Sequence, residues 1–417
     1  MDKIVVRKSG PLQGEVKISG AKNAALPILV TSLLVNGENT YHNVPGLQDV
    51  ESVKQLLTTL GARVHTDGHT VKIDGSGINQ TKAPYDIVRK MRASILVLGP
   101  LLARMGKAKV SLPGGCAIGA RPINLHLKGL ARLGASIELK HGNVEAEVSQ
   151  LIGNDIYFDV PTVTGTENLM MTAVLAKGET ILRNAAREPE IIALADALNK
   201  MGAKIEGAGS SVISIKGVSA LSPAEITIIP DRIEAGTFMV ASALTRGDIK
   251  IVDCEPDHMR GIIHKLGLTG ANIQIEGRTI RVKGPDVISS VDVKTLPYPG
   301  FPTDMQAQFM VLMSVAKGYC VISETIFENR FIHVSELRRL GADITVSGNS
   351  AMIKGSQALS GAQVMATDLR ASASLILAGL VAEGSTEINR VYHLDRGYEG
   401  IEKKFGQLGA DIQRLRE

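Results

Sequence analysis

A cysteine and an arginine lie close together in a segment whose composition suits neither a helix nor a central strand. Residues 111–122 read Ser-Leu-Pro-Gly-Gly-Cys-Ala-Ile-Gly-Ala-Arg-Pro, which places Cys116 and Arg121 among three glycines and two prolines. Proline and glycine at this density break helices and interrupt strand pairing. We therefore expect a mobile surface loop with a thiol that can donate a proton or, as a thiolate, act as a nucleophile. A lone cysteine in an ordinary turn is the alternative.

Polar and charged residues recur where predicted strands lead into apolar helices. The first set is Lys22-Asn23, Arg92, Thr164-Gly165, Asp231-Arg232, Thr303-Asp304, and Asp368 with Arg370. The second set, in the other strand-to-helix loops, is Cys116 with Arg121, Arg187, Arg330 and Arg396. Helix N-termini expose free N–H groups and partial positive charge, to which the arginines add. The sets predict a site for a multiply anionic ligand, a phosphate or carboxylate. Solvated caps and surface ion pairs are the alternative.

Two series of glycines, each with six members, indicate the elements that position these residues. A Gly-Ala pair closes a helix-like segment every 68 to 73 residues, at Gly61, Gly134, Gly202, Gly270, Gly341 and Gly409. Apolar helices end at the other series, where glycine suits the left-handed conformation, at Gly37, Gly106, Gly178, Gly247, Gly318 and Gly384. The clearest such helices are Ala24–Asn36, Asn168–Lys177, Thr237–Arg246 and Ala371–Glu383. Because they are apolar on most faces, we expect them to be buried.

The repeats predict an α/β fold of six βαβαββ-type units. Three units form a first lobe over residues 22–229, and three form a second lobe over residues 230–417, which the N-terminal strand within residues 1–21 is expected to join. Each lobe should hold its buried helices inside and its sheets outside, as an inside-out α/β barrel. A ligand cleft is expected between the lobes, because domain interfaces are preferred pocket sites.

The composition narrows the possible function classes. At 417 residues the chain exceeds what one core usually supports, so two domains are the default. A net charge of +4, no Trp and only 7 Phe and 7 Tyr argue against a nucleic-acid partner. We find no apolar run of about eighteen residues and no signal-peptide core, so we expect no membrane partner. Three cysteines form neither a disulfide framework nor a metal spacing, which favours the cytoplasm and predicts no metal or cofactor.

Six segments together resemble the enolpyruvyl transferases. They are Gly20–Pro27, Ser111–Leu125, Pro302–Gln306, Glu328–Arg330, Thr367–Ser372 and Asp395–Tyr398. The similarity runs from Lys3 to Arg414 and is most specific in the Pro-Gly-Gly-Cys loop, which the sister enzyme of the shikimate pathway lacks. It is therefore closest to the branch of the family that makes the first committed precursor of bacterial peptidoglycan. The resemblance implies two inside-out lobes, in agreement with the repeats.

The resemblance also implies a reaction. The 3′-hydroxyl of UDP-N-acetylglucosamine adds to C2 of phosphoenolpyruvate, C3 is protonated, and phosphate then leaves. Cys116 is the implied acid at C3, can add to phosphoenolpyruvate covalently, and is the implied target of the epoxide antibiotic fosfomycin. Asp304 is the implied acceptor of the hydroxyl proton, with helix capping as its structural alternative.

The implied substrate contacts are mostly cations and helix-terminal donors. Lysine supplies a compact point charge and arginine a bidentate fork. The implied phosphoenolpyruvate clamp is Lys22, Arg121 and Arg396, with Asp368, Arg370 and Arg330 beside it; Lys22 and Arg396 are expected to be catalytic. The implied nucleotide contacts are Arg92, Arg121, Pro122, Ile123, Asn124 and Leu125, with Val163, Thr164 and Gly165 acting through backbone N–H groups. Asn23, Asp304 and Ile326 complete the implied substrate-binding set.

Two positions depart from the family pattern. Some relatives carry a basic residue where this chain has Gln48, so we assign no anion contact there. Asn124 stands where an acidic acceptor for uracil is expected; its amide oxygen can accept a hydrogen bond, but without the charge.

Two other function classes remain open on the sequence. An RNA-end cyclase on a related repeat fold is disfavoured by the weak charge and scarce aromatics. An idle paralogue that binds sugar nucleotide as a regulator is disfavoured because Cys116, Asp304, Lys22 and Arg396 occur together. Cys254 and Cys320 lie in strand-like runs and are expected to be structural, since a packed thiol behaves as a small hydrophobe. His393 is expected to be a core or supporting residue.

Overall fold

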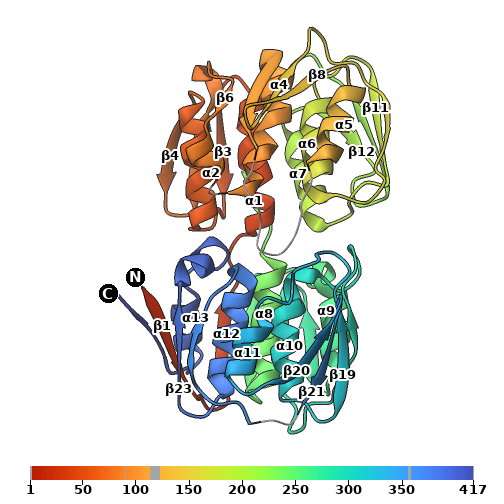
Figure 1. The fold of residues 1–417 in the computed structure, drawn as a ribbon. Helices are drawn as coiled ribbons and strands as arrows, with labels where there is room; N and C mark the ends of the chain where they lie inside the picture. The colour runs from red at the N-terminus through yellow and green to blue at the C-terminus, as the bar shows by residue number, and fades with distance from the viewer. Residues whose placement is uncertain (1, 90, 113–122, 356–357, 417) are drawn as a thin grey trace. The chain divides into compact units, whose positions relative to one another are not determined.

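The computed structural model describes residues 2–89, 91–112, 123–355 and 358–416, and the chain divides into two units (Figure 1). Over these described ranges, the first unit contains residues 20–112 and 123–229, and the second contains residues 2–19 and 230–416. The chain therefore passes from one unit to the other after Ser19 and again after Ile229.

Three four-stranded sheets form the outside of the first unit, counted over its described residues. In each sheet a parallel pair of strands is extended by an antiparallel hairpin. In spatial order the strands are β14 (Glu225–Thr227), β3 (Glu38–His42), β5 (Thr70–Asp74) and β4 (Arg63–Asp67); β6 (Lys82–Ala83), β7 (Lys107–Ser111), β9 (Asn143–Glu147) and β8 (Ser136–Lys140); and β10 (Asp155–Tyr157), β11 (Glu179–Arg183), β13 (Val212–Lys216) and β12 (Lys204–Glu206).

The second unit repeats this pattern, again with three sheets within the part of the chain that is described. Its strands in spatial order are β2 (Gln13–Lys17), β15 (Asp248–Val252), β17 (Thr279–Lys283) and β16 (Asn272–Glu276); β18 (Val293–Lys294), β19 (Tyr319–Ser323), β21 (Ser350–Lys354) and β20 (Asp343–Ser347); and β22 (Gln363–Met365), β23 (Ser385–Asn389), β1 (Lys3–Arg7) and β24 (Ile412–Leu415). The six sheets and their common strand order confirm the predicted α/β repeat architecture.

Three strands complete sheets far from their own place in the sequence. β2 runs parallel to β15, β1 lies between β23 and β24, and β14 runs parallel to β3. The N-terminal segment is also held by side chains, because the N–H of Ser19 donates to Glu234 Oε2 at 2.7 Å. Lys404 Nζ donates to Ser19 Oγ at 2.8 Å and to Glu234 Oε1 at 2.6 Å. The first nineteen residues are thus an integral part of the second unit.

The helices fall into a buried set and an amphipathic set. In Figure 1 the buried helices run through the middle of each unit and the strands along its outside. The buried set is α1 (Lys22–Val30), α4 (Leu98–Met105), α6 (Val163–Ala173), α8 (Arg232–Leu244), α10 (Gln306–Ser314) and α12 (Leu369–Val381). The others are α2 (Gln48–Thr59), α3 (Tyr85–Val88), α5 (Asn124–Arg132), α7 (Pro189–Lys200), α9 (Arg260–Leu268), α11 (Val334–Arg339) and α13 (Ile401–Gln407). The short 3-10 helices are η1 (Thr31–Leu34), η2 (Gly75–Gly77), η3 (Arg92–Val97), η4 (Pro256–Met259), η5 (Thr303–Met305) and η6 (Val391–Arg396).

The buried helices start earlier in the chain than the sequence analysis predicted. α6 begins at Val163, not Asn168, because Thr162 Oγ1 caps it by accepting the N–H of Gly165 at 3.2 Å. α8 and α12 likewise begin directly after Asp231 and Asp368, whose carboxylates accept first-turn N–H groups. The polar residues assigned to loops are therefore caps and first-turn residues of the buried helices.

The glycine predictions hold at eleven of the twelve positions. All six glycines of the Gly-Ala pairs have positive φ, between 91° and 108°. In the second series Gly37, Gly106, Gly178, Gly318 and Gly384 also have positive φ. The prediction for Gly247 is wrong, because the preceding Arg246 takes the left-handed conformation with φ 54°. A Cβ at Gly247 would approach Leu12 O to 2.3 Å, so close packing explains that glycine.

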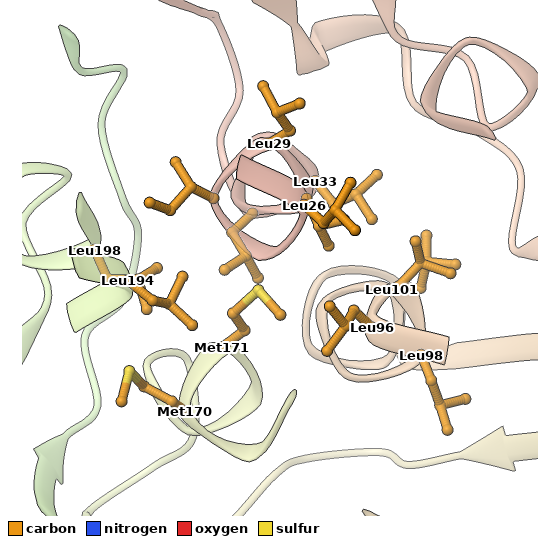
Figure 2. Packing of buried hydrophobic residues seen from close by; sticks show 14 of the residues in the cluster. Leu26, Leu29, Leu33, Leu96, Leu98, Leu101, Met170, Met171, Leu194 and Leu198 are labelled. Carbon is orange, nitrogen blue, oxygen red and sulfur yellow. The ribbon is translucent and has the colours of Figure 1, made fainter. Parts of the chain in front are cut away.

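Close packing of helices in the first unit depends on small residues. Figure 2 shows buried leucine and methionine side chains gathered from four segments, including Leu26, Leu101, Met171 and Leu194. A Cβ at Gly99 would approach both Asn168 Oδ1 and Thr172 Oγ1 to 2.1 Å, so α4 and α6 can meet only where α4 lacks a side chain.

We expect Gly99→Ala to lower the free energy of unfolding by about 1–3 kcal/mol or more, the usual cost of overpacking a core. The matched control is Gly267→Ala in α9, where an added Cβ meets nothing within 4 Å. The control should be neutral or more stable by up to about 1 kcal/mol, since alanine is the better helix former. Urea denaturation of the full chain measures both, and an unchanged midpoint for Gly99→Ala would contradict the close-packing argument.

Candidate active site

Lys22 and Asp49 form a buried ion pair at the start of α1. Lys22 is 7% exposed, and its Nζ lies 3.6 Å from Oδ2 of Asp49 in the first turn of α2. A buried ammonium is costly without a counter-charge, and Asp49 supplies one. No acidic residue lies in the first turn of α1, so the helix terminus and Lys22 both favour an anion there. Asn23 is half-buried beside Lys22, whereas Gln48 is exposed at the start of α2.

Residues predicted to hold the nucleotide come from three helical segments of the first unit. Arg92 begins η3, Asn124 begins α5, and Thr164 lies in the first turn of α6. The buried side chain of His126 links these segments, because its Nε2 lies 3.2 Å from Oγ1 of Thr164. Burial and then the charge of Arg92 lower the pKa of His126 to about 4. The structure therefore brings Arg92, His126 and Thr164 together.

The N-terminus of α6 offers fewer backbone donors than predicted. The N–H of Gly165 is already taken by Thr162 Oγ1. The N–H groups of Val163 and Thr164 make no hydrogen bond to any residue that the structure describes. Val163 and Thr164 are both half-buried, so their two donors are the ones able to meet a ligand. Ile123 and Leu125 are also half-buried, and Asn124 is exposed.

Asp304 is the centre of a charged cluster in the second unit. Its Oδ1 accepts from Arg330 Nη2 at 3.0 Å, and its Oδ2 accepts from Arg370 Nε at 3.1 Å. The two arginines are 4% and 1% exposed. Asp304 is not a helix cap, because η5 has Pro302 at its N-cap and no side-chain cap hydrogen bond. The capping alternative is therefore wrong, and the carboxylate serves the two guanidinium groups instead.

Arg370 keeps two hydrogen-bond donors open. Its Nη1 and Nη2 are buried and have no hydrogen-bond acceptor among the described residues. The guanidinium lies over the ring of Tyr398, 5.2 Å from the ring centroid. Burial acts to lower the pKa of Arg370, but Asp304, followed by Tyr398 and Asp231, raises it above the ordinary value. A permanently charged, desolvated guanidinium with open donors is well suited to bind a carboxylate or phosphate.

Glu324 holds the loops on either side of this cluster. Its Oε1 accepts from Thr295 Oγ1 at 3.0 Å and from the N–H of Ile326 at 2.8 Å, while Oε2 accepts from Thr303 Oγ1 at 2.9 Å. Glu324 therefore links the backbone of Ile326, a predicted contact residue, to the side chain of Thr303, which precedes Asp304.

Arg396 ends η6, which a second arginine anchors. Arg414 of β24 forms a two-pronged salt bridge with Asp395, beside Arg396. His393 is half-buried, and its pKa is lowered first by burial and then by the charge of Arg396, while Asp368 opposes this. His393 is therefore close enough to both Arg396 and Asp368, the cap of α12, for their charges to act on it.

Some predicted residues lie elsewhere or outside the described ranges. Cys116, Arg121 and Pro122 fall within residues 113–122, which are not described. Arg187 donates to the carbonyl of Gly209 at 3.3 Å on an exposed segment. Cys254 and Cys320 are buried, and burial raises the pKa of Cys254 to about 11 and that of Cys320 to about 12, as expected for structural thiols.

Several residues that support the candidate site were not predicted from the sequence. They are Asp49, His126, Asn168, Glu324, Tyr398 and Arg414. One signal was available for His126, which lies eight residues before the Gly-Ala pair at Gly134, as His333 does before Gly341. The others carried no spacing signal, because their partners lie far away along the chain.

No group of three or more His, Cys, Asp or Glu side chains is placed to hold a metal ion in the described part of the chain. Among those same residues, no helix is both long enough and apolar enough to cross a membrane.

Comparisons with known proteins show the family of this chain. Residues 6–405 match the family described as EPSP synthase (3-phosphoshikimate 1-carboxyvinyltransferase). The chain is 68% identical over 416 residues to the UDP-N-acetylglucosamine 1-carboxyvinyltransferase of Desulfatibacillum aliphaticivorans, with 100% of both chains covered. It is 61% identical to the enzyme of that name from Geobacter metallireducens (100% of both chains) and 59% identical to that from Myxococcus xanthus (99% of both).

Solved structures show the same fold. The enolpyruvyl transferase NikO from Streptomyces tendae superposes with a TM-score of 0.89 at 24% identity, covering 99% of both chains. EPSP synthase from Acinetobacter baumannii superposes with a TM-score of 0.78 at 18% identity, covering 100% of both. Given these full-length similarities, the chain belongs to the enolpyruvyl transferase family, the group of carboxyvinyltransferases that includes EPSP synthase.

Proposed function

We propose that the chain transfers the enolpyruvyl group of phosphoenolpyruvate to the 3′-hydroxyl of UDP-N-acetylglucosamine and releases phosphate, a step in making peptidoglycan precursors. Family membership supports enolpyruvyl transfer, and relatives named for UDP-N-acetylglucosamine are between 59% and 68% identical over the whole chain. Within the molecule, the observation that carries the proposal is the Asp304 carboxylate between two buried arginines, one of which has open donors.

The reaction needs a base for the hydroxyl, an acid for C3 and cations for the substrate anions. Asp304 is the proposed base: its carboxylate, held between Arg330 and Arg370, accepts the hydroxyl proton as the oxygen attacks C2. The open Nη1 and Nη2 of Arg370 suit the carboxylate or phosphate of phosphoenolpyruvate. Lys22 and Arg396 add charge for the same anions.

Cys116 is the proposed acid that donates its proton to C3 as the new C2–O bond forms. In the elimination a base takes a proton from C3 and phosphate departs from C2, which restores the C2–C3 double bond and gives the enol ether of the nucleotide sugar. This assignment rests on the resemblance of the Pro-Gly-Gly-Cys loop, since Cys116 lies outside the described residues. Arg121, from the same loop, completes the proposed anion clamp.

The uridine diphosphate part is assigned to Arg92, Asn124 and the first turn of α6, with Ile326 as a further contact. Arg92 and the N–H groups of Val163 and Thr164 are donors that suit phosphate oxygens. The proposed partners are therefore two small molecules. The proposal places the reaction in the cytoplasm, which fits a chain of three cysteines without a disulfide framework.

Phosphate release from phosphoenolpyruvate tests the proposed function. Release should be rapid with UDP-N-acetylglucosamine and negligible without it, and mass spectrometry should show the enolpyruvyl ether of the nucleotide sugar. Release that does not depend on the sugar nucleotide would contradict the proposal.

Asp304→Asn should lower kcat by about 10²–10⁴-fold, the usual contribution of a general base, because an amide of the same shape cannot take the proton. Binding of UDP-N-acetylglucosamine should change only a few-fold. The melting temperature should also fall, since Arg330 and Arg370 lose their shared counter-charge.

The matched control for Asp304→Asn is Asp257→Asn, which breaks an exposed pair with Arg260 in the same unit. The control should leave kcat and the melting temperature unchanged, because exposed pairs contribute little. A lower melting temperature with normal kcat in Asp304→Asn would make Asp304 a counter-ion only.

Cys116→Asp should remain active with a more acidic pH optimum, because a carboxyl group has an ordinary pKa of about 4 against about 8.5 for a thiol and so keeps its proton only at lower pH. Cys116→Ser should be far slower, since a hydroxyl is a much weaker acid. A pH–rate profile of the three proteins, with mass measurement after fosfomycin treatment, checks this. Wild-type rates in the serine variant, or alkylation of the aspartate variant, would rule out Cys116 as the acid.

A further inference from the structure

A buried histidine in the first unit has both ring nitrogens engaged by one helix. His126 lies in the first turn of α5 and is 3% exposed. Its Nδ1 lies 3.1 Å from Nδ2 of Asn168, and its Nε2 lies 3.2 Å from Oγ1 of Thr164, both on α6. The proposed reaction uses the backbone of Thr164, but gives no role to the Thr164 hydroxyl, to His126 or to Asn168.

Two backbone groups fix the orientation of the Asn168 amide. Its Oδ1 accepts the N–H of Gly99 at 2.9 Å, and its Nδ2 donates to the carbonyl of Ile95 at 3.1 Å. In the flipped orientation the amide nitrogen would face the N–H of Gly99, and the amide oxygen would face the carbonyl oxygen of Ile95. Neither hydrogen bond could then form. The nitrogen of the amide therefore faces Nδ1 of His126 and donates to it.

This hydrogen bond fixes the tautomer of His126. A ring nitrogen that accepts a hydrogen bond carries no proton, so the single proton of the neutral imidazole is on Nε2. The low pKa caused by burial and by Arg92 keeps the ring neutral near pH 7. The Nε2–H group therefore donates to Thr164 Oγ1.

This hydrogen bond determines whether the Thr164 hydroxyl can donate to a ligand or accept from it. Because its oxygen accepts from His126, its own proton is left to be donated to another acceptor. Thr164 is half-buried in the first turn of α6, beside the N–H groups of residues 163 and 164, which meet no described acceptor. Arg92 adds a positive charge close to His126. Such a set of donors and a cation suits the diphosphate of a nucleoside diphosphate.

We propose that His126 is a positioning residue that turns the Thr164 hydroxyl into a hydrogen-bond donor for the diphosphate of the sugar nucleotide. The inference rests on the proposed function, because it assumes that UDP-N-acetylglucosamine binds at the first turn of α6. It assigns His126 no contact with the substrate and no part in proton transfer.

Thr164→Val removes the hydroxyl at nearly constant side-chain shape. It should raise both the Kd and the KM for UDP-N-acetylglucosamine by about tenfold or more, the scale of a lost hydrogen bond to a charged group. The KM for phosphoenolpyruvate should stay within about twofold of the wild-type value. The melting temperature should fall by a few degrees, because the buried Nε2–H group of His126 loses its acceptor. Thr164→Ser, which keeps the hydroxyl, should restore wild-type binding.

His126→Met tests the indirect action. It should raise the KM for UDP-N-acetylglucosamine as Thr164→Val does, and the double variant should be no worse than either single one, since both changes remove the same hydrogen bond. His65→Gln, on the exposed face of β4, is the matched control and should change nothing. If His126→Met fails to fold, unchanged binding of UDP-N-acetylglucosamine by Thr164→Val would still overturn the inference.

The outcomes separate this inference from the proposed function. If wild type binds UDP-N-acetylglucosamine and Thr164→Val binds it equally well, the inference falls and the proposed function stands. Additive losses in the double variant, or equal losses for both substrates in His126→Met, would make His126 a structural residue and also overturn it. If titration calorimetry shows no binding of UDP-N-acetylglucosamine by wild type, both fall together.

Discussion

The central helices are buried on almost every face, and this burial limits where polar side chains can lie in the molecule. All nine residues of α10 are buried, as are twelve of the thirteen residues of α8. A polar group inside such a helix needs a hydrogen-bond partner to offset its desolvation cost, so the residues of the candidate site gather at the helix starts. Lys22, Thr164, Asp304 and Arg370 all lie within the first turns of buried helices or in the 3-10 turn before one. Free N–H groups and the positive end of the helix then give these positions a shared preference for anions.

The charged side chains buried in this molecule differ in whether their hydrogen-bond donors are all used. Glu234 and Lys404 neutralise each other, and Lys22 is matched by Asp49. Asp304, in contrast, is one carboxylate shared by two buried guanidinium groups, and Arg370 still has two donors without an acceptor in the described residues. Arg370 differs in this respect from Lys404, whose buried partner Glu234 accepts its hydrogen bond. The two open donors of Arg370 are groups that an anionic ligand could use.

The sequence predicted the repeat well because the repeat depends on local rules. Glycine after each amphipathic helix must take a left-handed conformation, and alternating apolar residues must form strands on a buried face, so period and element type could both be read. The helix starts were misjudged because Thr162, Asp231 and Asp368 act as caps through side-chain geometry that spacing does not reveal. β14 stays in the first unit and pairs with β3, and β2 joins the second unit by pairing with β15, in each case with strands more than 180 residues apart. Of the candidate site, the cations and Asp304 could be predicted from their loops, whereas Asp49 and Glu324 could not, because a lone buried acid has no local pattern.

His126 and His333 show how one repeat position can serve two environments. Each lies eight residues before its Gly-Ala pair, in α5 or just before α11, and burial is the main reason that the pKa of each falls to about 4. In the first unit the imidazole meets the neutral partners Asn168 and Thr164. In the second it is placed near the charges of Asp368 and Arg330, and its Nε2 has no hydrogen-bond partner among the described residues. A neutral imidazole can be buried at both places because it offers one donor and one acceptor without a charge. The fold can therefore keep a histidine at this repeat position in both units, although the first unit surrounds it with neutral groups and the second places it near charged ones.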